Sequence, residues 1–441
     1  MRRVTKVLAT IGIAAMASLV LTACGTSKNS SKSSGGKITI RLLTRQVGDS
    51  PQVKDYKDVL KQFEKDHKNV KIVDESQGDE NQYNNILKTA RSSNDLPNIF
   101  NIQGVANLGE YIDNKLIMNT EPIFKADKKW SDGFTKAGMD YVTIPGYKGK
   151  WGVPFQAGLV GVYYNQALFK KAGYDTFPKT FDQFEDAVKK LRAMGVTPIS
   201  LGAKDAFTVG HLHNLIFYRM LGVDAAKQLG ARKLKWTDPK VVKTIQMIKD
   251  LKDMKAFDPN AVGIGVDSAG TAFETGKAAM FISGVWMIPT FNDPSKTPVS
   301  KDVRFAKFPY FKDTPQFKDD DMQGLQSYQI RGDLKGEAKT LTIELLKKLT
   351  DKEFATKWAN DAGLIMPRSD YTIEKKNDSV LFQENVDLAA TSKKAAVDVF
   401  ESDPIQSMQD VTRNAFVGVL QGDSPTKAAQ TIQQTIDNKG Q

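Results

Sequence analysis

The chain alternates between two hydrophobic periods early in its sequence, and this alternation constrains the fold more than any other feature. Residues 38–43 are apolar at every second position, as in a strand. Residues 56–63 then place apolar side chains three and four apart, as on one face of a helix. The two patterns recur over 70–73, 83–90 and 96–102. This order predicts an α/β fold in which helices cover both faces of a parallel-rich sheet.

Similar units recur later in the chain. We expect further strands over 160–164, 198–201, 278–282 and 304–308, and further helices over 181–194, 341–349 and 425–436. Another helix should begin at Pro239, because Asp238 can cap it and a proline at the first helical position needs no donor. The region from about residue 38 to residue 441 is too long for one ordinary core, so we expect two domains.

The N-terminus has the pattern of a secretory signal. Arg2, Arg3 and Lys6 precede an uncharged run over residues 7–20. This run is too short to cross a hydrocarbon core about 30 Å thick. We therefore expect residues 1–23 to be removed as a signal peptide.

Cys24 follows this segment directly and is the only cysteine of the chain. Together with Leu-Thr-Ala at 21–23 it resembles the lipobox of bacterial lipoproteins, which implies that Cys24 is acylated and anchors the protein to a membrane. The following residues to position 37 are rich in Gly, Ser and Lys, so 24–37 should form a lipidated, flexible tether. A single cysteine also excludes an internal disulfide.

The formal net charge of +11 raises the alternatives of nucleic-acid or membrane-surface binding. Loss of the three cationic residues of the signal peptide would reduce it to +8. Lysines alternate with acidic residues, for example at 57–58, 64–66 and 318–319, so no basic stripe forms. We expect a solvated surface and no nucleic-acid partner.

Several segments resemble the signature of the extracellular solute-binding proteins of family 1, which include maltose- and multiple-sugar-binding proteins. The signature segments are WGVPFQ at 151–156, GVYYN at 161–165 and LFKKAG at 168–173. Further matches in family order are LPNIF at 96–100, PKTF at 178–181, FETGKAAM at 273–280 and GVW at 284–286. Asn98 stands where the family commonly has aspartate.

The resemblance implies a type II periplasmic-binding-protein-like fold, with two α/β lobes joined by hinge strands and the solute bound between them. We place the lobes and their crossings from the positions of the motifs. The first lobe is expected over 38–155 plus 326–367 and the second over 157–323 plus 371–441, with crossings near 156–158, 324–327 and 367–371.

The resemblance also implies a function. We expect an exported, lipid-anchored receptor on the extracellular face of the cytoplasmic membrane that binds an oligosaccharide by hinge closure and delivers it to the permease subunits of an ABC importer. Residues 205–211 resemble a segment of multiple-sugar and raffinose-type receptors, which favours an α-linked galactoside or glucoside. We expect a monomer without a cofactor.

A sugar offers hydroxyls and apolar C–H faces, so its site needs amide and carboxylate partners together with flat aromatic rings. Ligands of open α/β sheets lie beyond the carboxyl ends of the strands, so residues that follow predicted strands are candidates. The polar candidates are Gln46, Asp49, Gln77, Asp79, Gln103, Gln156, Asp205 and Gln326, and the remaining ones are Trp151, Phe155, His211, Trp286 and Arg368.

Five of these candidates have a structural alternative. Asp49 and Asp205 each precede a predicted helix and could cap it. Trp286 could fill the core, and Trp151 could pack at the edge of a lobe. Arg368 could form a surface salt bridge.

Metal binding and catalysis find little support in the sequence. His211 and His213 are two residues apart on a predicted helix and point to different faces, so we expect no metal site. The chain has no Gly-x-Ser-x-Gly, no His-Glu-x-x-His and no P-loop, and we expect no enzymatic activity. Two alternatives stay open: the same fold binding glycerol phosphate, a polyamine or a metal, and a surface-anchored glycoside hydrolase.

Overall fold

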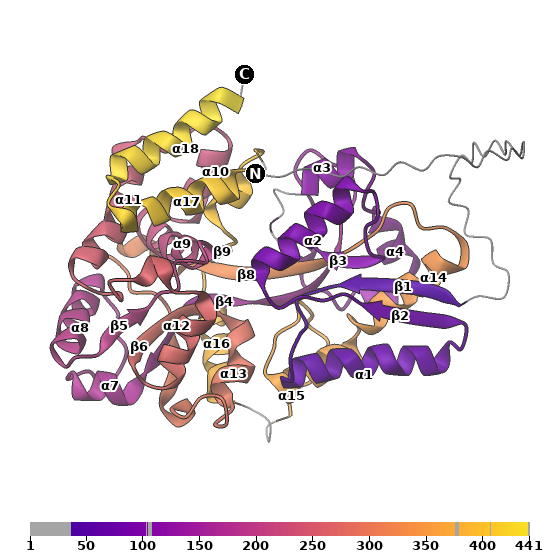
Figure 1. Cartoon of the computed structure of the whole chain (residues 1–441), viewed down its shortest axis with the longest axis horizontal. Helices are drawn as coiled ribbons and strands as arrows, with labels where there is room; N and C mark the ends of the chain where they lie inside the picture. Colours follow the sequence, from indigo (N-terminus) through magenta and orange to yellow (C-terminus); the bar gives the residue numbers. More distant parts are fainter. Residues whose placement is uncertain (1–36, 103, 105–107, 375–378, 406, 440–441) are drawn as a thin grey trace, which may run out of the picture. The chain divides into compact units, whose positions relative to one another are not determined.

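A mixed sheet is the centre of the computed structural model, which describes residues 37–439 except 103, 105–107, 375–378 and 406 (Figure 1). In this described part the sheet has nine strands, and its main path is β2-β1-β3-β8-β4-β6-β5, with β7 beside β4 and β9 beside β8. The strands are β1 Ile38–Leu43, β2 Val70–Asp74, β3 Ile99–Asn101, β4 Val153–Asn165, β5 Thr197–Ser200, β6 Ala278–Gly284, β7 Val303–Ala306, β8 Asp320–Ile330 and β9 Lys394–Ala396.

Helices cover this sheet. Those before β4 are α1 Pro51–Asp66, α2 Glu80–Ser92, α3 Leu108–Asp113, α4 Glu121–Ala126, α5 Lys128–Ser131 and α6 Lys136–Tyr141. Those between β4 and β8 are α7 Gln166–Lys171, α8 Phe181–Ala193, α9 Phe207–Leu221, α10 Val223–Gly230, α11 Pro239–Asp253, α12 Val266–Glu274 and α13 Ile288–Asn292. After β8 come α14 Gly336–Lys348, α15 Lys352–Ala362, α16 Val380–Ala390, α17 Met408–Gln421 and α18 Pro425–Lys439.

Two long strands connect the two ends of the sheet, and Figure 1 shows them passing between the two lobes. We call the end that contains β1, β2 and β3 the first lobe and the end that contains β5, β6 and β7 the second lobe. The C-terminal end of β8 pairs with β3, and the C-terminal half of β4 pairs with β6 and β7. Between these regions β4 and β8 pair with each other, so both strands are shared by the lobes. The exact lobe boundaries stay a prediction.

The direction of strand pairing differs between the ends and the middle of the sheet. The pairs β1–β2 and β1–β3 in the first lobe and β5–β6 in the second are parallel, as the strand and helix alternation predicts. The pairs β3–β8, β4–β8 and β4–β6 are antiparallel. β4 runs from the first lobe to the second, whereas β8 runs from the second lobe to the first. The two strands therefore pair antiparallel in the middle of the sheet.

Most predicted elements agree with the structure. Asp238 caps α11 by accepting a hydrogen bond from the Lys240 amide at 3.0 Å, and α11 begins at Pro239 as predicted. Strand β4 is much longer than the predicted strand over 160–164. Its N-terminal half contains Pro154 and Gly158, residue types that argue against a strand interior, so its extended conformation was missed.

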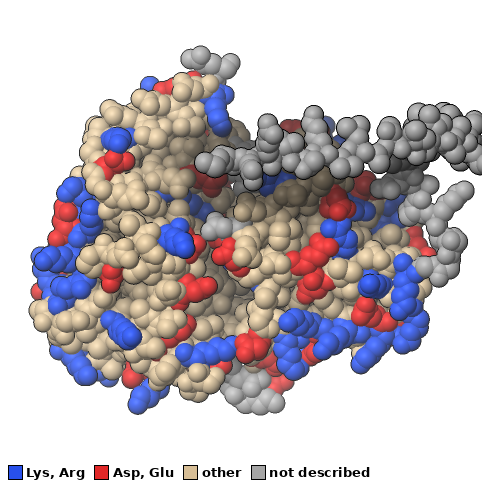
Figure 2. Space-filling view, viewed as in Figure 1, with Lys and Arg blue, Asp and Glu red and all other residues tan. Residues whose placement is uncertain are grey.

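The surface charges of the protein are mixed in sign. On the face in Figure 2, Lys and Arg side chains are interspersed with Asp and Glu and form no continuous basic band. Separately, among the described residues no helix has both the length and the apolar character needed to cross a membrane.

Candidate ligand-binding site

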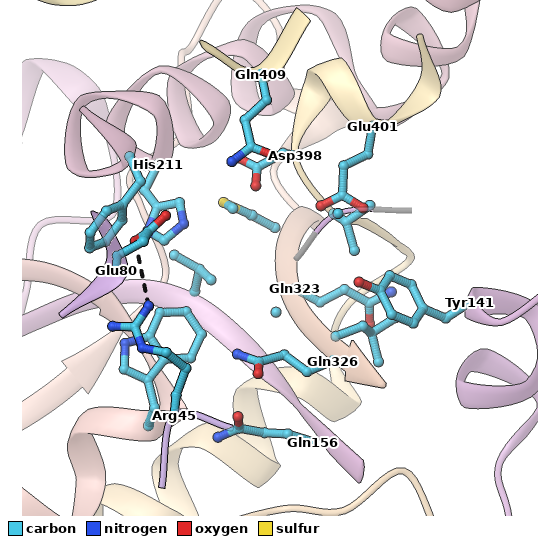
Figure 3. A pocket seen from close by; sticks show the side chains of 18 of the residues that line it. Arg45, Glu80, Tyr141, Gln156, His211, Gln323, Gln326, Asp398, Glu401 and Gln409 are labelled. Carbon is cyan, nitrogen blue, oxygen red and sulfur yellow. Dashed lines mark ion pairs between the residues drawn. The ribbon is translucent and has the colours of Figure 1, made fainter. Parts of the chain in front are cut away.

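A cavity of about 300 Å³ opens beside the middle of the two shared strands (Figure 3). Its lining combines amides, charged groups and aromatic rings from segments far apart in the sequence. The lining residues are Arg45, Gln46, Gln52, Glu80, Gly104, Tyr141, Gln156, Val160, Phe207, His211, Trp286, Met322, Gln323, Gly324, Leu325, Gln326, Leu364, Val397, Asp398, Glu401, Gln409 and Arg413.

Two glutamines of the shared strands lie side by side in this cavity. Gln156 of β4 and Gln326 of β8 are direct partners in the antiparallel pairing, and Figure 3 shows their side chains next to each other. Gln156 is 5% exposed, and Gln326 is half-buried. An amide offers both a donor and an acceptor, so the pair can hydrogen-bond neighbouring hydroxyls of one ligand.

The indole of Trp286 lies against two glycines. Trp286 belongs to the short turn Val285–Met287 that follows β6, and it is half-buried. A Cβ atom at Gly284 would lie 2.3 Å from Trp286 Cζ3, and one at Gly324 would lie 2.7 Å from the same atom. Because neither distance is sterically possible, only glycine at these positions lets the ring approach the strands so closely.

His211 lies near this indole, with a ring-centroid distance of 5.9 Å, and near Phe207 at 5.3 Å. Its Nδ1 atom is buried and has no hydrogen-bond partner among the described residues. Burial lowers the pKa of His211 to about 4, so the imidazole is neutral at neutral pH. A neutral imidazole beside an aromatic ring can exchange a hydrogen bond with a ligand hydroxyl.

His213 lies in a different environment from His211, as expected for two residues on different helix faces. Its ring is fully buried and stacks on Phe416 with centroids 4.0 Å apart. Its Nε2 atom lies 3.0 Å from the Thr244 hydroxyl. Within the described ranges, no three His, Cys, Asp or Glu side chains gather in a way that could hold a metal ion.

Charged groups from both lobes meet at Glu80 of α2. Its carboxylate lies 3.9 Å from Arg45, an ion pair drawn in Figure 3, and 3.8 Å from Arg413 of α17. The pKa of Glu80 is raised, because the effect of burial exceeds the opposing effect of the positive charges of Arg413 and Arg45. Arg413 also lies 3.4 Å from Asp398. Glu80 and Arg413 therefore join α2 of the first lobe to α17 directly beside the cavity.

Tyr141 faces acidic residues from the C-terminal part of the chain (Figure 3). The pKa of its phenol is raised because little water reaches it and because the carboxylates of Glu401 and Asp398 lie nearby. Tyr141 ends α6, and both acids come after β9. The cavity thus has polar groups on opposite sides, supplied by segments more than 250 residues apart.

The structure brings five of the predicted ligand residues together in the cavity: Gln46, Gln156, His211, Trp286 and Gln326. Asp205 lines an adjoining cavity instead. Its carboxylate also accepts a hydrogen bond from the Val266 amide at 2.7 Å, at the start of α12. It therefore anchors α12 and not the helix that directly follows it. Gln103 and Cys24 lie outside the described residues.

Asp49, Gln77 and Asp79 do not line the cavity. Asp49 is exposed and pairs with Lys296 at 2.7 Å, and it does not cap α1, whose N-cap position is Ser50. Asp79 caps α2 through the Gln82 amide at 2.8 Å. The Gln77 side chain donates a long hydrogen bond of 3.4 Å to a neighbouring backbone carbonyl.

Trp151, Phe155 and Arg368 also lie away from the cavity lining. Trp151 packs at the edge of a hydrophobic cluster of the first lobe. Phe155 is buried and stacks on Tyr328 with centroids 4.0 Å apart. Arg368 forms a salt bridge with Asp370, as the alternative of an ion pair predicts. The arginine is only 4% exposed, however, so it does not lie on the surface.

Several lining residues were not among the sequence-based candidates. They are Arg45, Gln52, Glu80, Tyr141, Gln323, Asp398, Glu401, Gln409 and Arg413. Gln323 could have been found, because it lies on the same crossing strand as Gln326. The residues from α17 and the preceding turn carry no local pattern, because only the tertiary fold brings the C-terminal segment to the cavity.

Comparison with known proteins finds relatives of this chain. Multiple sugar-binding protein of Streptococcus mutans is 25% identical over 299 residues, which cover 63% of this chain and 64% of that protein. An uncharacterized ABC transporter extracellular-binding protein of Pyrococcus horikoshii is 24% identical over 232 residues, 52% of this chain and 51% of the relative. The matches therefore span about half to just under two thirds of these relatives.

Solved structures match more of the chain. A chitin oligosaccharide binding protein superposes with a TM-score of 0.82 at 24% identity, over 92% of this chain and 99% of that one. The protein RafE in complex with raffinose gives a TM-score of 0.71 at 18% identity, over 90% of this chain and 98% of that one. These similarities confirm the predicted two-lobed α/β fold of type II.

A family model agrees with both results. The model described as bacterial extracellular solute-binding protein matches residues 49–360, which include the signature segments and both shared strands. The chain therefore belongs to the family of bacterial extracellular solute-binding proteins.

Proposed function

We propose that this protein is the solute-capturing component of an ABC importer and that it binds an oligosaccharide in the cavity beside β4 and β8. One observation carries the proposal: the paired amides of Gln156 and Gln326 and the indole of Trp286 line one cavity. Amides satisfy sugar hydroxyls, and a flat ring covers the apolar C–H face of a pyranose. Membership of the family and the name of the Streptococcus mutans relative support a sugar as the solute.

Closure of the two lobes is the proposed binding mechanism. The cavity takes Gln46 and Tyr141 from the first lobe and Trp286 and His211 from the second, so a bound sugar contacts both. Such contacts form fully only when the lobes approach each other. Shifting a two-state population from 1:99 to 99:1 requires about 5.5 kcal/mol of this differential binding. A micromolar dissociation constant corresponds to a binding free energy of about −8 kcal/mol, which is larger in magnitude than this required difference.

Isothermal titration against maltose, maltotriose, raffinose and chitin oligosaccharides tests the proposal. We expect heat for at least one saccharide, with an α-linked galactoside or glucoside preferred, and no heat for glycerol phosphate, polyamines or metal ions. Binding of only these other solutes would contradict the sugar assignment. Chromatography of the recovered ligand distinguishes a receptor from a glycoside hydrolase, because a receptor returns the saccharide intact whereas a hydrolase returns shorter products.

We also propose that acylation of Cys24 holds the protein at the extracellular face of the cytoplasmic membrane. The sequence before Cys24 supports this, since it has the order of a signal peptide followed by a lipobox-like segment. Cell fractionation of the wild type and of Cys24→Ala tests it. We expect the wild type in the membrane fraction and the variant unprocessed or released into the medium. Equal partitioning of both proteins would contradict the lipid anchor.

A further inference from the structure

A second cavity adjoins the first. It has a volume of about 310 Å³ and shares Glu80, Phe207, Gln409 and Arg413 with the first cavity of about 300 Å³. Shared lining residues mean that the two cavities are neighbours around the same four side chains. The second cavity therefore has about the same volume as the first and adjoins the cavity that Trp286 lines.

The second cavity is the outer one. Asn84, Lys204, Asp410 and Asn414 line only this cavity, and all four are exposed. The shared residue Arg413, in contrast, is only 8% exposed. A ligand that fills the inner cavity could therefore continue past the shared residues toward solvent without displacing the core.

Both lobes supply groups to the outer cavity. Asn84 belongs to α2, which lies in the first lobe together with Glu80. Asp410 and Asn414 belong to α17, which packs into the core of the second lobe through Phe416. They are four residues apart, so they share one face of that helix. An amide from one side and a carboxylate and an amide from the other can hydrogen-bond hydroxyls of a unit held between them.

The shared residue Phe207 gives the two cavities a common apolar wall. Its ring begins α9, is half-buried and lies edge-on to His211. It is the only aromatic side chain that lines the outer cavity among the described residues. The outer cavity is thus mainly polar with one ring at its inner end, which suits a hydroxyl-rich unit linked to a unit already stacked inside.

We propose that the outer cavity is a second saccharide subsite, which holds further units of an oligosaccharide whose first units lie against Trp286. This proposal rests on the proposed function and specifies its substrate as a chain longer than the inner cavity alone can hold. The covalent link makes binding of the outer unit intramolecular, so even a few hydrogen bonds there raise the affinity for longer chains. Affinity should therefore increase with chain length until the outer cavity is filled.

Two adjacent asparagines of α2 provide a matched test. Asn84 and Asn85 are both exposed, but only Asn84 lines the outer cavity. Dissociation constants of wild type, Asn84→Leu and Asn85→Leu are measured by isothermal titration with a homologous series from disaccharide to hexasaccharide. We expect Asn84→Leu to weaken binding of the longer saccharides about two- to tenfold, the loss of one neutral hydrogen bond. Binding of the disaccharide should be unchanged, and Asn85→Leu should match the wild type throughout.

Asn414→Leu repeats the test from the opposite side of the outer cavity, with Gln421→Leu on the same helix as its control. Equal affinities of the wild type for short and long saccharides would overturn the second subsite and leave the proposed function intact. The same holds if both Asn84→Leu and Asn414→Leu leave the chain-length dependence unaltered. Absence of binding for every saccharide would instead overturn the proposed function, and the subsite with it.

Discussion

Gly158 of β4 lies directly opposite Gly324 of β8 in the antiparallel pairing of the two shared strands. Both glycines are covered by the turn that carries Trp286. A Cβ atom at Gly158 would lie 2.1 Å from Val285 Cγ1, and one at Gly324 would lie 2.7 Å from Trp286 Cζ3. The absence of side chains at this pair therefore lets the turn pack onto the middle of the strands and fixes the position of the indole.

Gly158→Ala should destabilise the protein. The added methyl group would overlap Val285, which is fully buried, and the backbone φ of +159° at Gly158 is one that L residues rarely adopt. Overpacking of this kind costs about 1–3 kcal/mol. Urea denaturation measures the loss. Gly270→Ala is the control, because its Cβ would lie 3.7 Å from Glu274 Oε1 within α12, an ordinary contact. Alanine there should stabilise the helix by up to about 1 kcal/mol, so equal effects of the two substitutions would contradict the packing argument.

Trp286→Ala should weaken saccharide binding about thirtyfold. This corresponds to about 2 kcal/mol for loss of the apolar surface that the indole offers to the ligand. Trp286→Phe keeps a flat ring and should recover most of the affinity. Gly324→Ala should also weaken binding, because the indole must move away from the new Cβ. Isothermal titration checks all three variants. Wild-type affinity of Trp286→Ala would show that the indole does not contribute to ligand binding.

Arg368→Ala should lower stability but leave ligand affinity unchanged. Nη1 of Arg368 donates to the backbone carbonyls of Trp130 at 3.1 Å and Thr350 at 2.9 Å, and its other nitrogens bind Asp370. Its loss leaves the Trp130 and Thr350 carbonyls without this donor, and an unsatisfied buried polar group costs about 1–3 kcal/mol. Thermal denaturation and titration of the folded variant measure the two effects.

The control for this variant is Lys136→Ala, which breaks an exposed pair with Asp140 in α6. Exposed pairs contribute below about 1 kcal/mol. If Arg368→Ala were as stable as Lys136→Ala but bound the saccharide poorly, the arginine would act on the ligand and not on the fold.

The two buried histidines should make the protein less stable as the pH decreases below 6.5. Asp55, whose pKa burial raises to about 6, partly offsets this loss. Burial lowers the pKa of His211 to about 4 and that of His213 to about 3, from 6.5 in the unfolded chain. Above pH 6.5 neither state binds these protons. Below it the unfolded chain binds them and the folded protein does not, until the folded pKa values are reached. The unfolding free energy therefore decreases by up to about 1.4 kcal/mol per pH unit for each histidine.

Urea denaturation at pH 7, 6 and 5 measures this dependence. His211→Gln and His213→Gln should each reduce the slope of unfolding free energy against pH, whatever they do to the stability at pH 7. An unchanged slope in both variants would show that other groups cause the acid sensitivity.

The sequence predicted the scaffold better than the site. The strand over 38–43 and the start of α11 at Pro239 follow from local patterns and coincide with the structure. Gln156 and Phe155 are adjacent on β4, but the pairing with β8 is irregular between Pro154 and Gln156. Regular strand alternation does not hold at such a bulge, so no sequence pattern showed that Gln156 lines the cavity whereas Phe155 is buried in the core.

Other site residues were out of reach for local reasoning. Arg413 meets Glu80 across more than 300 residues of sequence, and no periodicity relates the two. An arginine such as Arg368 can bind a ligand or form a surface ion pair. Only its burial and its hydrogen bond to the Trp130 carbonyl reveal a structural role. Such assignments depend on tertiary contacts that sequence patterns do not encode.

Each lobe is built from segments that lie far apart in the sequence, and this has a consequence for how the protein acquires its fold. The indole of Trp358 in α15 donates to the Gln52 carbonyl of α1 at 3.2 Å, a contact across 306 residues. The core of the second lobe likewise needs Ile432 of α18. Neither lobe can complete its interior before most of the polypeptide has been synthesised, and loops this long slow the search for native contacts. A nascent chain with this topology therefore remains without a finished globule until synthesis is nearly complete.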